Sequence, residues 1–60
     1  KSLIVNKNLN AGKKISYKDI SSMRPSNGIS PLSIDKIVNK KLKVDKKEGE
    51  MIYWKDIYHE

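Results

Sequence analysis

The sequence contains two similar nine-residue segments that decide the fold, GKKISYKDI at residues 12–20 and GEMIYWKDI at residues 49–57. Five of the nine positions are identical, and the tyrosine of the first segment aligns with the tryptophan of the second. Two copies are too few for a solenoid, which needs at least three repeats to bury a continuous core. The repeat therefore predicts two similar units that pack on one core and are related by an approximate twofold axis.

Each unit has the same local pattern of a strand, a turn and a short helical turn. The apolar residues 3–5 and the alternating residues 42–44 are typical of short strands. The glycine that opens each segment supplies the turn, and the isoleucine that follows it enters the core. In the first unit Ser16 is placed to cap the helical turn, and Asp19 is placed to complete a capping box.

The segment between the two units predicts a tight loop. Pro25 suits the second position of a turn, and Asn27 and Gly28 follow it closely. We therefore expect Gly28 to adopt a positive φ, which glycine does without steric cost.

A helix is predicted after this loop. Ser30 is placed as its N-cap and Pro31 lies in its first turn. Its approximate apolar face is formed by Leu32, Ile34, Ile37 and Val38. We expect about two helical turns that end near Asn39. The resulting fold class is a small, irregular β-rich domain with short helical turns and an internal pseudo-twofold.

The composition excludes several classes of site. A chain of sixty residues without cysteine must fold on apolar packing and backbone pairing alone. His59 is the single histidine, so a zinc site is excluded, and the carboxylates show no catalytic grouping. We expect most of the core to consist of Leu3, Val5, Ile15, Ile20, Ile29, Ile37, Leu42, Ile52 and Ile57.

The net charge of +6 comes from thirteen basic residues, of which all but Arg24 are lysines spread along the chain. Nucleic-acid readers more often concentrate arginine on one face, so a solvated lysine surface is the better interpretation. No stretch has the length of a membrane span, which predicts a soluble protein. The absence of an initial methionine favours a single domain over residues 1–60 that is part of something longer.

Several of these segments together resemble a known family. Residues 2–5, 9–12 and 15–20, and above all the RPSNGISP string at residues 24–31, are similar to the SAF or antifreeze-like domain that follows the barrel of sialic acid synthases. The resemblance implies a β-clip fold, related to that of the type III antifreeze proteins. Asn39 departs from the family pattern, which usually has glycine there, but asparagine tolerates the left-handed conformation.

The resemblance also implies a function. Such synthases condense phosphoenolpyruvate with N-acetylmannosamine or a related amino sugar, on a TIM barrel that carries a divalent metal and the acid–base groups. The SAF domain itself would hold no cofactor. It would reach across a homodimer to cover the barrel of the partner subunit, in a cytoplasmic enzyme. Arg24 matches the arginine that contacts the amino sugar, and we expect Pro25, Asn27, Gly28 and Ile29 to shape its loop.

The chemistry of Arg24 is compatible with this role. Because Pro25 follows it, its backbone is biased to an extended conformation at the entrance to a turn. A planar fork of donors suits an acylamido carbonyl and sugar hydroxyls. The competing interpretation is an ion pair with a surface carboxylate. Tyr17, Met23 and Trp54 are expected to be core residues or partner contacts rather than ligand contacts.

Other functions stay open. A free ice-binding protein would share the fold, but Lys13 and Lys14 lie where type III antifreeze proteins use small uncharged residues. A basic nucleic-acid module is a third possibility, and it would bind with a steep salt dependence. The sequence does not identify which amino sugar the longer enzyme would use.

Overall fold

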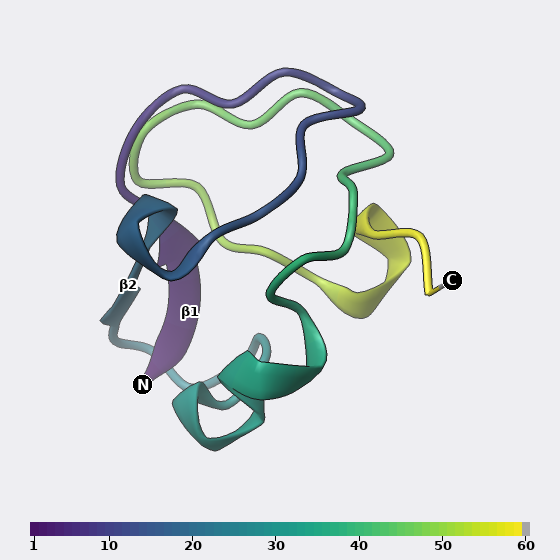
Figure 1. Cartoon of the computed structure of the whole chain (residues 1–60). Coiled ribbons are helices and arrows are strands. Elements are labelled where there is room, and N and C mark those ends of the chain that lie inside the picture. The colour runs from purple at the N-terminus through teal and green to yellow at the C-terminus, as the bar shows by residue number, and fades with distance from the viewer. Residues whose placement is uncertain (60) are drawn as a thin grey trace.

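The structure is a computed structural model that describes residues 1–59 (Figure 1). Its regular elements are two short strands and three 3-10 helices: β1 (Ser2–Val5), η1 (Tyr17–Asp19), β2 (Ile20–Met23), η2 (Pro31–Lys36) and η3 (Trp54–Asp56). The strands pair antiparallel, with Ser2 opposite Met23 and Val5 opposite Ile20. Loops joined by isolated bridges make up the rest, so the fold is the small, irregular β-rich type that the sequence predicts.

The predicted twofold relation is visible in the backbone hydrogen bonds. Leu9 and Lys46, which hold equivalent positions in the two units, exchange both of their N–H···O bonds at 2.8 Å. A residue that pairs in this way with its own counterpart lies on the pseudo-axis. Figure 1 shows the two long loops that contain them running side by side at the top of the molecule.

The same relation holds away from the axis. Gly12 N donates to Leu42 O at 2.8 Å, and its counterpart Gly49 N donates to Val5 O at 2.9 Å. The bridge between Ile4 and Met51 in turn corresponds to the bridge between Lys14 and Lys41. The two Gly-x-x-Ile units are therefore related by an approximate twofold, as predicted.

The core is also as predicted. All nine expected residues are buried in one apolar cluster, which Leu9 completes. Ile34 and Val38 pack against its edge. Leu9 stands between two asparagines in the sequence, so no periodic pattern marks it as a core residue.

Both helical turns of the repeat are closed by a buried aspartate. The Asp19 carboxylate accepts bonds from Ser16 N at 3.3 Å and from Ser16 Oγ at 3.0 Å, which confirms the expected box. In the second unit Asp56 accepts from Tyr53 N at 2.9 Å. A carboxylate that ties down the first residues of a turn is thus common to both halves.

The central helix begins as predicted but differs in type and length. Ser30 Oγ accepts a bond from Leu32 N at 3.2 Å, with Pro31 in the first turn. The helix is 3-10 and ends at Lys36 rather than near Asn39. With three residues per turn, Ile34 and Ile37 lie on one line, so Leu32 points outward and is 95% exposed. Its predicted place on the apolar face is wrong.

Two further local predictions are wrong. Residues 42–44 form no strand: Leu42 makes an isolated bridge to Ile57, and Val44 is exposed. Gly28 has no positive φ; the glycines in that region of conformation are Gly12 and Gly49, at 90° and 91°. The reason for glycine at position 28 is close contact, described below.

Candidate functional site

The segment that carries the candidate site leaves the end of β2. Arg24 follows Met23 directly, and the peptide bond between Arg24 and Pro25 is cis. Residues 24–27 are all exposed, whereas Ile29 is buried in the core. The segment is therefore a surface loop with one end fixed by the strand and the other by a core side chain.

Ser2, on the neighbouring strand β1, holds the middle of this loop. Its side chain is fully buried, and its Oγ donates to Pro25 O at 2.6 Å and accepts from Gly28 N at 2.9 Å. The terminal ammonium of Lys1 adds a bond to Ser26 Oγ. Because one hydroxyl bonds both sides of the loop, the turn between them has little freedom to move. Sequence reasoning did not single out Ser2 as part of the site.

Gly28 and Ile29 close the loop against β1. A Cβ at Gly28 would lie 3.3 Å from Ser2 Cβ, so a side chain there would press on Ser2, whereas Met51 Sδ at 3.5 Å would be in ordinary contact. Leu3 N donates to Ile29 O at 2.9 Å. Asn27, in contrast, is exposed. The structure therefore places Ile29 in the core and Gly28, half-buried, against Ser2, and it leaves Arg24 and Asn27 facing outward.

The Arg24 side chain is exposed and has no acidic partner in the part of the chain that the structure describes. Within residues 1–59 the ion pairs are Lys7 and Lys13 with Asp19, and Lys46 with Asp56. The surface ion pair considered above for Arg24 is therefore not formed in this part of the chain. A rigidly based arginine whose donors are free is able to bind an uncharged acceptor or an anion from another molecule.

The exposed aromatic and sulfur side chains are not in the core. Tyr17 is 57% exposed, Met23 is 52% exposed and Trp54 is 43% exposed. Tyr17 Oη donates to Asp35 Oδ1 at 2.5 Å, and this bond to a carboxylate raises the pKa of the phenol. Their expected place in the core is therefore wrong, and contact with a partner stays a prediction.

The buried carboxylates serve the fold. Burial alone would raise the pKa of Asp19, but the bonds from Ser16 and the ammonium of Lys13 outweigh it and hold the pKa below its usual value. Residues 1–59 contain no group of three His, Asp or Glu side chains that could hold a metal ion. The ring Nε2 of His59 lies 3.1 Å from Trp54 O at the edge of η3. Among residues 1–59 no helix has the length and apolar character of a membrane-spanning segment.

Comparison with known proteins agrees with this architecture. The family model described as the SAF domain matches residues 1–57. An uncharacterized protein of Methanocaldococcus jannaschii is 37% identical over 57 residues, which cover 95% of this chain and 17% of that relative. The chain thus spans about a sixth of the length of the curated relative it matches. With its two related units, its single core and this match over nearly its whole length, the chain belongs to the SAF domain family.

Proposed function

We propose that this domain caps the active site of a sialic-acid-synthase-type enzyme, which condenses phosphoenolpyruvate with N-acetylmannosamine or a related amino sugar. The observation that carries the proposal is the Arg24 guanidinium, which forms no ion pair with any described residue and is held out from the fold by a loop that Ser2 fixes. The RPSNGISP string at residues 24–31, which resembles the family's sugar-contacting loop, supplies the substrate class.

The proposed role divides the chemistry between two domains. A TIM barrel of the longer protein would carry the divalent metal and the acid–base groups, and this domain would contribute binding and closure. The Arg24 fork would donate to the acylamido carbonyl and hydroxyls of the sugar. Fixing the loop in advance lowers the entropy lost when the sugar binds. Pro25, Asn27, Gly28 and Ile29 would keep the arginine in place rather than touch the substrate.

The proposed arrangement is an exchange between subunits of a homodimer, with each domain over the barrel of its partner. Met23, which is 52% exposed beside Arg24, offers an apolar contact to such a barrel. Thioether side chains suit this use because they adapt to an irregular surface.

Mixing two inactive forms of the full-length enzyme tests this proposal. One form carries Arg24→Ala and the other carries an inactivated barrel. In the mixed dimers an exchanged cap places one intact Arg24 over one intact barrel, so part of the activity should return. If subunit mixing is confirmed and no activity returns, Arg24 serves its own barrel or none, and the exchange is ruled out.

A further inference from the structure

A cavity of about 370 Å³ lies between the two repeats, away from the Arg24 loop. It is lined by Lys14, Asn39, Lys41 and Tyr58, which come from three separate segments of the chain. Its volume falls within the range of about 300 to 1,000 Å³ that is usual for small-molecule sites. Among residues 1–59 no carboxylate lines it, and its lining side chains all end in polar groups.

Two of these residues are directly opposed. Lys14 and Lys41 face each other across an isolated antiparallel bridge. The bonds from Ile15 N to Lys40 O at 2.8 Å and from Leu42 N to Lys13 O at 3.0 Å flank them, so they form a non-hydrogen-bonded pair. Side chains approach most closely at such pairs, and like charges placed there destabilise the sheet.

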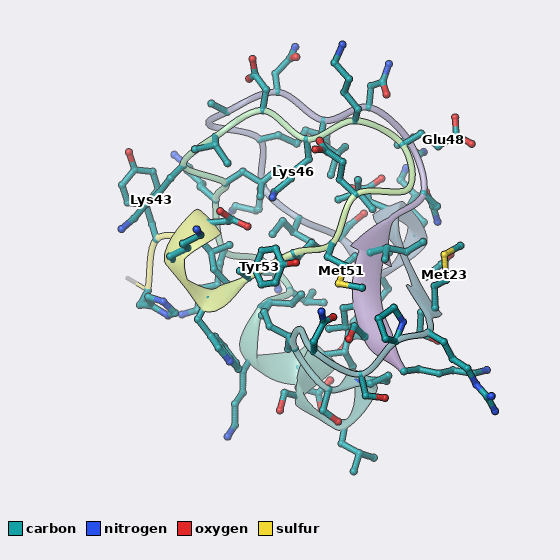
Figure 2. The ribbon with its side chains drawn as sticks, turned by 180° about the vertical axis from the view of Figure 1, so that it is seen from behind. Met23, Lys43, Lys46, Glu48, Met51 and Tyr53 are labelled. Carbon is teal, nitrogen blue, oxygen red and sulfur yellow. The ribbon has the colours of Figure 1, made fainter. Side chains whose placement is uncertain are left out.

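Neither ammonium is neutralised within the described part of the chain. The ion pairs among residues 1–59 use Lys7, Lys13 and Lys46. Lys43 adds another positive charge nearby, because its Nζ lies 5.5 Å from the centre of the Tyr58 ring. Figure 2 shows Lys43 beside η3, at the opposite edge of the molecule from Met23. The cavity therefore has an excess of positive charge and free hydrogen-bond donors.

The bridge related to Lys14–Lys41 by the pseudo-twofold carries different side chains. The counterparts of Lys14 and Lys41 are Met51, which Figure 2 shows beside β1, and Ile4 of β1, and they form an apolar pair. The counterpart of Asn39 is Ser2, and Gly28 approaches Ser2 and Met51 so closely that a Cβ there would lie 3.3 Å from Ser2 Cβ and 3.5 Å from Met51 Sδ. The space beside Ile4 and Met51 is thus covered by the loop, whereas the equivalent space beside Lys14 and Lys41 is open. The lysine pair is not needed for the fold, since an apolar pair serves the same backbone.

We propose that this cavity binds a phosphate monoester. Two ammonium groups, the Asn39 amide and the Tyr58 hydroxyl offer donors to one ligand. A phosphate monoester has three terminal oxygens and close to two negative charges, which match these donors better than a single carboxylate does. The space beyond the phosphate would hold the organic part. This site does not depend on the function proposed for Arg24, which does not line the cavity.

Titration of the ¹⁵N-labelled chain with glycerol 3-phosphate at constant ionic strength tests the proposal. We expect saturable shifts at the amides of residues 14, 39, 41 and 58, with a dissociation constant on the order of millimolar. Shifts that stay linear with concentration, or that saturate elsewhere on the surface, would overturn the site. Malonate that saturates the same residues at equal concentration would overturn the phosphate assignment.

The matched variants come from the pseudo-symmetry itself. Lys14→Met with Lys41→Ile introduces the pair that already occupies the symmetry-related bridge, so the backbone should be retained while binding weakens roughly tenfold or more. Lys36→Gln with Lys47→Gln removes the same charge from exposed positions outside the cavity and should leave binding nearly unchanged. Equal weakening in both double variants would mean that net charge alone attracts the ligand, and would overturn the site.

A single variant covers the case in which the variant with Lys14→Met and Lys41→Ile fails to fold. Tyr58→Phe removes one hydroxyl at a half-exposed position and leaves the charge unchanged. We expect its binding to weaken roughly threefold while the shifts of residues 14 and 41 persist. Unchanged affinity would remove Tyr58 from the site and overturn the proposed set of donors.

Discussion

Asp19 in the first half and Asp56 in the second hold the same position in their repeats, but different lysines reach them. Lys7 and Lys13 approach Asp19 at 3.5 and 3.4 Å, and about half of each lysine side chain is exposed. Lys46 approaches Asp56 at 2.8 Å with only 11% of its side chain exposed. Both aspartates close a helical turn, so the repeat preserves the bond to the backbone. The lysines that neutralise the aspartate differ between the two halves.

The two halves also differ at the pseudo-axis and on the surface. The side chain of Leu9 belongs to the core, while the side chain of its counterpart Lys46 forms an ion pair with Asp56. The first half carries a loop packed over Ser2, and the second carries an open cavity over Asn39. The same backbone therefore carries two different surfaces, and we propose a different ligand for each.

The largest effect is expected at the loop that distinguishes the first half. In the proposed full-length enzyme, Arg24→Ala should reduce kcat/KM for the amino sugar by a factor that corresponds to about 2 to 4 kcal/mol of transition-state binding, because acceptor atoms of the sugar lose their donors in a closed site. Saturation by phosphoenolpyruvate should change much less. Arg24→Lys should rescue only part of the loss, since an ammonium lacks the planar fork. Steady-state kinetics with Lys36→Ala as the control measure this, and an unchanged kcat/KM would remove Arg24 from the site.

The next effect separates the two aspartates. Lys46→Met should lower the free energy of unfolding by about 2 kcal/mol, because the buried Asp56 carboxylate loses its cation. Lys13→Met should cost less than about 1 kcal/mol, because that pair is partly exposed and Lys7 remains. Methionine keeps the apolar stem in both variants. Urea unfolding measures the difference, and equal losses would mean that burial does not distinguish the two pairs.

The glycines test what the halves have in common. Gly12 and Gly49 have φ values of 90° and 91°, and an added Cβ would meet no atom within 4 Å at either position. Alanine should therefore cost only the backbone conformation, about 1 to 2 kcal/mol at each site. The two single variants should unfold at nearly the same urea concentration. A loss of stability at one glycine more than twice that at the other would show that the turns are not equivalent in energy.

The smallest effect concerns acid stability. The folded state holds the pKa of Asp19 below its usual value of 3.8. The ionised carboxylate therefore stabilises the fold above that pH, and this contribution is lost as the pH falls through the lower, folded-state pKa. Asp19→Asn should be less stable than the native chain at neutral pH, with a smaller gap in strong acid. Thermal unfolding between pH 2 and 7 tests this expectation, and a gap that is constant with pH would contradict it.

The sequence predicted those parts of the fold that depend on local or repeated patterns. The repeat predicted the twofold and nearly all of the core, and Ser16 and Ser30 marked the starts of their helical turns. Gly28 was assigned the wrong reason, because a glycine required by close contact looks the same in sequence as one required by a positive φ. Leu32 was misplaced because a short apolar pattern does not distinguish an α-helix from a 3-10 helix.

The candidate site was less accessible to prediction. Arg24 was found through its resemblance to a family motif, not through any local pattern. The hold of Ser2 on the loop is a tertiary contact between residues far apart in the chain, so no spacing rule reveals it. The cavity was missed for the same reason, since Lys14 and Lys41 become neighbours only when the two halves pair.

The pairing of the two halves has a consequence for how the chain folds. The bonds from Gly12 to Leu42 and from Val5 to Glu50 both join one unit to the other. Strands β1 and β2 both lie in the first unit and pair with each other, but the bonds from Gly12 and Val5 have no acceptor until the second unit has left the ribosome. The core, which includes Ile52 and Ile57, must therefore await the last third of the chain, and contacts so distant in sequence slow folding for a domain of this size. Amide protons at these bonds should then become protected from exchange together, in one cooperative step.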